Sequence, residues 1–220
     1  MVALADGKEQ LMSILEKIAH LQGRRDEVPN QELAESLARS KSRPDIQEIA
    51  DNLDNRDPHI QADCLKVLYE IGYRDPSLIS RYSDAFVELL TSKNNRLVWG
   101  AMIALSTIVE LEFGAIGTHV KRIMEIMRNG SVITVDNGVR VLAVIASKEP
   151  KLRKELTGFL FEHLRTCRAK DLPQHSEKIR VAVGSSSKAE FLRILNARAG
   201  QLNTSQLKRV KKVMDLVKTV

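Results

Sequence analysis

The sequence predicts an all-α protein, a right-handed α-solenoid of stacked antiparallel helix pairs. Apolar residues recur at helical spacing along the chain, and this pattern itself repeats every 37 residues. The composition agrees, because aromatic residues make up only 4% of the 220 residues and the core must therefore be aliphatic. Strand patterning is weak, since the one β-branched stretch, at 132–135, continues into a helical pattern.

The repeat unit contains two helices. In the first helix, apolar residues stand at offsets 0, 4, 7, 8 and 11, which is the spacing of one helical face. Its three copies are Ile60, Cys64, Val67, Leu68 and Ile71; Leu97, Ala101, Ala104, Leu105 and Ile108; and Thr134, Gly138, Val141, Leu142 and Ile145. The second helix keeps the same step through Phe86, Val87 and Leu90; Ile123, Met124 and Met127; and Leu160, Phe161 and Leu164.

Capping residues predict where the helices begin and end. Asp57-Pro58 and Asp75-Pro76 each place a side-chain acceptor before a proline suited to the first helical turn. Ser187 with Glu190 and Asn203 with Gln206 have capping-box spacing, and Gly72 is expected to end a helix. We therefore expect helices at 6–21, 29–40, 44–54, 58–72, 76–91, 95–112, 115–128, 132–147, 150–168, 173–183, 187–199 and 204–219.

Helix pairs of this size bury their apolar faces only by stacking, so we expect one solenoid domain over 1–220. Residues 1–56 would form N-terminal capping helices and a partial repeat, 57–167 three clear repeats, and 168–220 a degenerate repeat with a C-terminal capping helix. The segment LVWGAMIAL at 97–105, with DPHIQADCLKVL at 57–68 as a weaker copy, resembles the HEAT-repeat family of armadillo-like superhelices. The resemblance covers about 44–200 and implies an architecture, not an activity, because such repeats serve many partners. The family's usual arginine after the first apolar position is replaced here by Gln61, Val98 and Val135.

Charge, apolar runs and cysteines restrict the class of protein. The net charge of +6 divides unevenly, at −5 over residues 1–110 and +11 over residues 111–220. The longest apolar stretch, Val98 to Leu105, is too short to span a bilayer, which takes roughly 20 residues, so we expect no membrane segment. The first ten residues show no secretion signal, and a cytoplasmic protein is expected. Cys64 and Cys167 are interpreted as buried thiols.

Charged residues at equal offsets in the second helices are candidates for partner binding. Glu88, Glu125 and Glu162 share one offset, and Arg128 and Arg165 follow the last two by three residues. Such pairs can form within a helix and extend between stacked neighbours. The resemblance implies that second helices line the concave groove. Two interpretations stay open, a structural ion-pair ladder and a stripe that binds a partner.

Trp99 and Ile103 are a second candidate. They lie one turn apart on the face opposite the apolar stripe, where we expect exposure to solvent, and tryptophan is enriched at binding hot spots. The alternatives are that the stacking face is simply wide at this point or that another segment covers the pair.

Basic residues in the second half are a third candidate, for nucleic acid. Contacts to phosphates would be electrostatic and without sequence preference. The residues proposed to contact a polyanion are Lys121, Arg122, Lys151, Arg153, Lys154, Arg168, Lys170, Lys208, Arg209, Lys211 and Lys212. The helix that carries the last four is equally well explained as a polar cap of the solenoid.

No catalytic, cofactor or metal site is predicted. The five histidines do not cluster in the sequence, and His163 with Cys167 is at most half a metal site. Residues 184–188, GSSSK, lack the features of a phosphate loop. Helical-repeat DNA glycosylases carry an aspartate one turn after a cleft tryptophan, whereas Ile103 follows Trp99 here.

We therefore predict a non-enzymatic scaffold or adaptor that binds a helix or extended segment of another protein through its groove or the Trp99 patch. Nucleic-acid binding by the basic half is the alternative. Self-association of the acidic and basic ends is also open.

Overall fold

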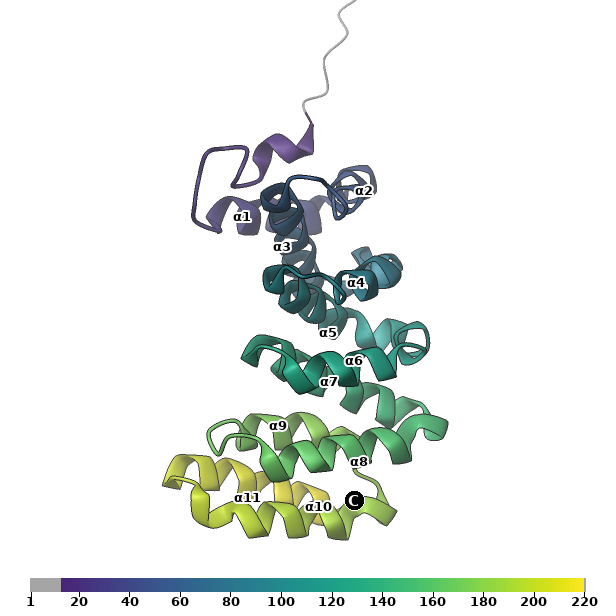
Figure 1. The fold of residues 1–220 in the computed structure, drawn as a ribbon, viewed down its shortest axis with the longest axis vertical. Helices are drawn as coiled ribbons and strands as arrows, with labels where there is room; N and C mark the ends of the chain where they lie inside the picture. The colour runs from purple at the N-terminus through teal and green to yellow at the C-terminus, as the bar shows by residue number, and fades with distance from the viewer. Residues whose placement is uncertain (1–12, 220) are drawn as a thin grey trace, which may run out of the picture.

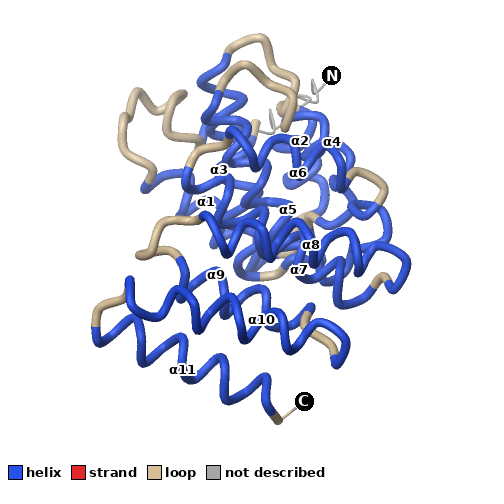
Figure 2. The backbone as a smooth tube through the Cα atoms, turned by 60° about the horizontal axis from the view of Figure 1, so that its bottom comes forward, coloured by secondary structure: helices blue, strands red, loops and turns tan. Residues whose placement is uncertain are grey.

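The computed structural model describes residues 13–219, and helices α1 to α11 form a stack along one axis (Figure 1). One row contains the first helix of each pair: α1 (Val28–Ser40), α3 (Pro58–Arg74), α5 (Asn95–Gly117), α7 (Val132–Lys148), α9 (Leu172–Ile179) and α11 (Thr204–Lys218). The second helices are α2 (Arg43–Asp51), α4 (Ser83–Leu89), α6 (Val120–Asn129), α8 (Pro150–Thr166) and α10 (Ser185–Arg198). Residues 13–219 contain no β-strand (Figure 2), so the predicted α-solenoid is confirmed.

The first helices form the densest part of the stack. Each packs against the next along the row, from α1 to α11, and each second helix packs against the first helix of the following pair. Leu68, Leu105 and Leu142 occupy equivalent positions of α3, α5 and α7, and all three have no exposed surface. The 37-residue spacing therefore corresponds to a physical repeat with one continuous apolar core.

Local side-chain chemistry accounts for several helix boundaries. The Asp57 carboxylate accepts a hydrogen bond from the backbone of His59 at the start of α3. The Asn203 and Gln206 side chains form the predicted capping box at the start of α11. The box predicted at Ser187 is wrong, because α10 begins at Ser185 and the Ser187 hydroxyl accepts from the backbone of Gly184.

Predicted and observed helix boundaries differ most in four places. Of the helix predicted at 6–21, residues 6–12 lie outside the described part of the chain, and the remainder contains only a 3-10 turn, Ile14–Lys17. The helix predicted at 76–91 is broken into 3-10 turns at Pro76–Leu78 and Ser80–Tyr82, followed by α4. The predicted break at 112–115 is only a kink at Glu112, and α5 continues to Gly117. The C-terminal part of the helix predicted at 173–183 is a 3-10 turn, Arg180–Ala182.

The break before α4 has a local and a tertiary cause. The Asp75 carboxylate accepts from both the backbone and the hydroxyl of Ser77, which favours a turn over a continuing helix. Ile79, with no exposed surface, packs over Gly72 of α3. Residue 79 therefore has non-helical backbone angles while its side chain completes the core.

Helix α5 is longer and more continuously apolar than the sequence patterning predicts. By length and composition alone it could cross a membrane. Most of it is buried against α3, α4 and α7, however, which is the environment of a core helix.

Candidate functional site

Charged and aromatic side chains connect successive second helices from α4 to α10, and we call the surface that carries them the second-helix face. Glu88 of α4 pairs with Arg122 of α6 at 3.2 Å. The Arg128 guanidinium of α6 lies over the Phe159 ring of α8, 5.5 Å from its centroid. Arg165 of α8 pairs with Glu162 at 3.0 Å and also with Glu190 of α10. Three successive interfaces are thus bridged.

This ladder agrees only partly with the sequence pattern. The Glu162–Arg165 pair within α8 is as predicted. Glu125 forms no ion pair within residues 13–219, and Arg128 contacts an aromatic ring instead. Arg122, which we assigned to polyanion binding, is a member of the ladder. Because the pairs are largely exposed, each stabilises the stack by only tenths of a kcal/mol, roughly 0.2–1 kcal/mol.

A hollow of about 530 Å³ lies between α2 and α4. We call it the acidic hollow. Its floor is formed by apolar side chains, and its rim by exposed carboxylates. The lining residues are Ala50, Leu53, Ala85 and Leu89 on the floor and Asp51, Asp54 and Glu88 on the rim. Asp51 and Asp54 form no ion pair within the described chain, although the Asp51 carboxylate accepts a hydrogen bond from Gln47; the third rim carboxylate, Glu88, is paired with Arg122.

A second hollow, of about 550 Å³, lies between α8 and α10. Phe161 and Pro150 contribute its apolar surface, and Arg153 and Lys154 its cationic groups. Arg153 donates to the backbone carbonyls of Ala146 and Ser147, at 3.0 Å each, and so caps the end of α7. Part of the basic charge that we assigned to polyanion binding is therefore used inside the fold.

The other polyanion candidates are divided between separate elements. Arg168 pairs with Asp171, and Arg209 pairs with Glu177 through two bonds of 2.9 and 2.7 Å. The lysines of this group lie on α6, α8, the loop after α8 and α11: Lys121, Lys151, Lys154, Lys170, Lys208, Lys211 and Lys212. These basic residues are therefore carried by separate elements of the chain, and two of them are paired with carboxylates.

The predicted exposure of the Trp99 patch is wrong for its second member. Ile103 is only 7% exposed and belongs to the core, while Trp99 is partly buried, with its ring 6.3 Å from that of Tyr69. The physical reason is the close approach of α3 and α5. A Cβ built on Gly100 would lie 2.7 Å from Leu65. The wide stacking face, left open as an alternative, explains this position.

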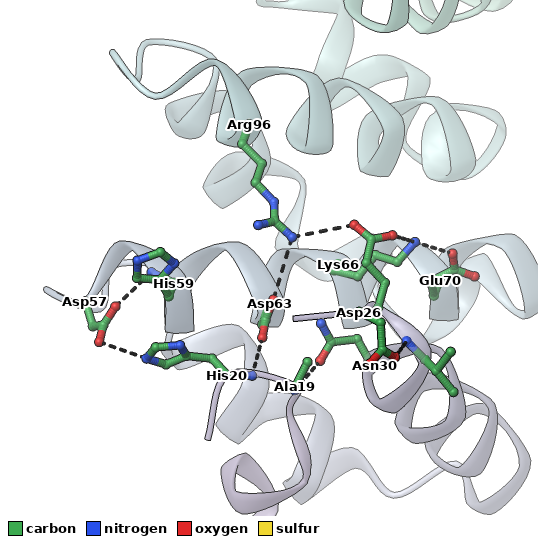
Figure 3. A network of polar contacts seen from close by, with 12 residues as sticks. Ala19, His20, Asp26, Asn30, Asp57, His59, Asp63, Lys66, Glu70 and Arg96 are labelled. Atoms are coloured by element: carbon green, nitrogen blue, oxygen red, sulfur yellow. Dashed lines mark hydrogen bonds and ion pairs between the residues drawn. The ribbon is translucent and has the colours of Figure 1, made fainter. Parts of the chain in front are cut away.

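A buried polar network surrounds the same face of α3 (Figure 3). Lys66 has a side chain only 8% exposed and pairs with Glu27 and Glu70. Arg96 of α5 reaches Glu27 at 3.5 Å and Asp63 at 3.8 Å (Figure 3). The Asp63, Lys66 and Glu70 spacing of three and four residues was the sequence signal for this network. These ion pairs and hydrogen bonds hold the segment before α1 against α3 and α5.

The five histidines do not cluster in the sequence, but the fold brings four of them together in two pairs. His20 and His59 stack with ring centroids 4.9 Å apart. His163 of α8 and His175 of α9 approach to 2.9 Å between Nε2 and Nδ1. Burial lowers the pKa of His163 to about 4, and burial also lowers the pKa of His175 against the opposing pull of Asp136. Both rings are therefore neutral near pH 7.

The two cysteines differ in environment. Cys64 has no exposed surface, as expected of a buried thiol, and burial raises its pKa to about 12. Cys167 is not a core residue. It is the half-buried C-cap of α8 and lines a cavity of about 330 Å³ together with His163 and His175. Two imidazoles and one thiol thus lie close together, whereas the sequence analysis had identified only His163 and Cys167 as potential metal ligands.

No protein-family model matches the chain, and no curated protein matches it. Solved structures do resemble it. An engineered protein superposes with a TM-score of 0.64 at 18% identity, covering 94% of this chain and 98% of the other. A designed armadillo repeat protein in complex with the peptide (KR)4 superposes at 0.70 with 14% identity, covering 96% and 94%. The chain has a HEAT/armadillo-like helical repeat fold.

A segment of a natural solenoid is similar as well. The karyopherin Kap121p, bound to the SUMO protease Ulp1p, superposes with a TM-score of 0.66 at 14% identity over 91% of this chain. The present solenoid spans only 22% of that karyopherin. At such identities the likeness concerns the helical-repeat architecture alone.

Proposed function

We propose that this solenoid is a non-enzymatic, protein-binding scaffold whose second-helix face holds an extended segment of a partner. A lysine or arginine of that segment would occupy the acidic hollow. The observation that carries the proposal is the hollow itself, in which the exposed Asp51 and Asp54 carboxylates rim an apolar floor. Long basic side chains fit such a site because they pack an aliphatic stem on apolar surface and extend a charged end to water.

The ladder of the second-helix face supports this proposal. Bridged helices keep the exposed side chains of successive repeats at fixed spacing, so the surface is formed before a partner arrives. A pre-formed surface lowers the cost of ordering on binding. One structure of similar fold, the designed armadillo repeat protein, holds a peptide of alternating lysine and arginine, which supports a basic occupant.

Fluorescence anisotropy with a labelled (KR)4 peptide tests the proposal. We expect saturable binding that weakens with added salt, because exposed charges are screened. The double variant Asp51→Asn, Asp54→Asn should weaken binding about two- to thirtyfold, since exposed ion pairs contribute about 0.2–1 kcal/mol each. A peptide of alternating aspartate and glutamate of equal length should not bind.

The matched control removes two carboxylates elsewhere. Glu32 and Glu155 are exposed, form no ion pair within residues 13–219 and do not line the acidic hollow. The variant Glu32→Gln, Glu155→Gln changes net charge by the same amount and should keep the wild-type affinity. Equal losses in both double variants would mean that the peptide responds to net charge, and the acidic hollow would then be rejected as its site.

A further inference from the structure

Three potential metal ligands converge where α8 ends and α9 begins. His163 lies in the last turns of α8, Cys167 caps its C-terminus, and His175 lies in α9. One ligand atom from each residue lies within 4.8 Å of the other two. Imidazole nitrogen and cysteine sulfur are the donors that Zn²⁺ prefers in proteins.

Asp136 of α7 fixes the orientation of one ring. Its Oδ1 lies 2.6 Å from Nε2 of His175, so Nε2 carries the proton and donates it. The lone pair of Nδ1 then points toward His163, whose Nε2 is 2.9 Å away. A histidine that donates one N–H to a carboxylate and offers its other nitrogen is the usual arrangement of a zinc ligand.

We propose that His163, Cys167 and His175 bind one zinc ion. Zinc bond lengths of about 2.0–2.1 Å to nitrogen and 2.3 Å to sulfur place tetrahedral ligand atoms about 3.3 Å apart for the N···N pair and 3.6 Å for N···S. The two nitrogens therefore need to separate by roughly 0.4 Å, and Sγ needs to approach by at most roughly 1.2 Å.

The position of Cys167 permits that approach. The residue follows the last turn of α8, and its Sγ has only long contacts, at 3.9 Å to the Leu164 carbonyl and 3.4 Å to the Arg198 guanidinium. On binding, the thiol releases its proton to solvent, and the His163 proton moves from Nε2 to Nδ1. The Arg198 guanidinium then donates to a thiolate, which is a stronger acceptor than the thiol.

The fourth coordination position faces the cavity of about 330 Å³. Besides the three ligands, its polar lining includes Asp136, Thr166 and Asp171. The site is open on this side, so a water molecule completes the tetrahedron. Asp136 and the thiolate together offset the two positive charges of the ion, while Asp171 offsets Arg168, with which it pairs.

Metal titration of the purified full-length chain tests the proposal. Co²⁺ serves as a spectroscopic substitute for Zn²⁺. We expect one equivalent to bind with a thiolate-to-cobalt charge-transfer band and the intense visible bands of tetrahedral coordination, and Zn²⁺ to displace it. Cys167→Ser should abolish the charge-transfer band, and His175→Gln should lower zinc affinity at least about 100-fold. Asp136→Asn should lower it about 10- to 100-fold, because it removes the carboxylate that orients His175.

The control is the other histidine pair. His20 and His59 stack at nearly the same ring distance and lie near Asp57, but within residues 13–219 they belong to no group of three potential metal ligands. The variant His20→Gln, His59→Gln should keep the stoichiometry and the charge-transfer band. Loss of metal binding in this variant, or cobalt spectra without a thiolate band in the wild type, would overturn the proposal. Circular dichroism of each variant shows whether the helical fold is retained, and Cys167→Ser, at a half-buried position, tests the site if His175→Gln fails to fold.

Discussion

Lys66 shows how a charged side chain is accommodated inside this solenoid. Its ammonium lies 3.0 Å from Glu27, 2.9 Å from Glu70 and 4.8 Å from the centre of the Tyr69 ring. Burial opposes the charged form, but the bonds to Glu70 and Glu27 outweigh it and raise the pKa of Lys66 above its ordinary value. A buried ion of this kind is tolerated only with its partners in place.

Glu70 makes the stability of this region depend on pH. Burial favours its neutral form, but the bonds from Lys66 and Arg74 are stronger in sum and lower the pKa of Glu70 below its ordinary value of 4.5. The folded state therefore holds this proton less tightly than the unfolded state does. The stabilisation is present above pH 4.5 and is lost as the pH falls through the folded-state pKa.

We predict that Glu70→Gln destabilises the protein more at pH 7 than at pH 3. Urea denaturation at the two pH values measures the difference in unfolding free energy. At pH 7 the loss should be about 1–3 kcal/mol, because Lys66 loses a partner in a buried position. Glu155→Gln, at an exposed and unpaired position of α8, is the control and should change stability little at either pH. A pH-independent loss in Glu70→Gln would contradict the prediction.

At the scale of elements, small residues set how closely α3 and α5 pack. A Cβ built on Gly72 would lie 2.3 Å from the Thr107 hydroxyl of α5 and 2.8 Å from Ile79. Ile79 is fully buried, so moving it would disturb the surrounding core. The sequence analysis expected Gly72 to end a helix. In the structure it lies inside α3, where α3 crosses α5.

We predict opposite effects for two glycine-to-alanine changes in helices. Gly72→Ala should lower the unfolding free energy by about 1–3 kcal/mol, because overpacking exceeds the gain in helix propensity. Gly158→Ala in α8 should raise it by up to about 1 kcal/mol, since nothing lies within 4 Å of the added methyl group. Urea denaturation measures both. Stabilisation by Gly72→Ala would show that α3 and α5 are more loosely packed than described.

The helix pairs were predictable from sequence where their apolar spacing is regular. α3, α7 and α8 lie within two residues of their predicted ends, because the apolar stripe is regular in each of them, and at α3 the capping residue Asp57 agrees with it. The break before α4 was not predictable, because burial of Ile79 against Gly72 depends on another helix. The exposure of Ile103 was mispredicted for the same reason, since the distance between α3 and α5 is a tertiary property.

The candidate sites also fall into those predictable from local sequence and those that depend on tertiary packing. The Glu162–Arg165 pair follows from spacing within one helix. The acidic hollow combines residues of α4 with residues at the end of α2 and just after it. The His163–His175 contact joins α8 to α9, and α9 lies in the segment predicted as a degenerate repeat, 168–220. Such sites depend on how neighbouring helices stack. The sequence does not specify that stacking in the partial repeat before residue 57 or in the degenerate repeat after residue 167.

At the scale of the whole molecule, each helix contacts only near neighbours along the stack. The core is continuous from Ile14 to Val217, but it is extended rather than centred on one point. In such a quasi-one-dimensional arrangement, the free energy of unfolding is approximately the sum of contributions from the repeats and from the interfaces between them. A substitution that destabilises one repeat should therefore destabilise only the adjacent repeats.

Two equivalent truncations test this locality. Val141 in α7 and Val210 in α11 both have no exposed surface, and replacing either by alanine should cost on the order of 2 kcal/mol locally. By hydrogen exchange with mass spectrometry, Val141→Ala should lower protection in α5 to α9, since α7 packs against α5, α6, α8 and α9. Val210→Ala should lower protection in α9 to α11 and leave α3 and α5 as in the wild type, because a terminal helix has stacked neighbours on one side. Uniform loss of protection throughout residues 13–219 in both variants would instead indicate a single cooperative unit, in which the separate interfaces do not unfold independently.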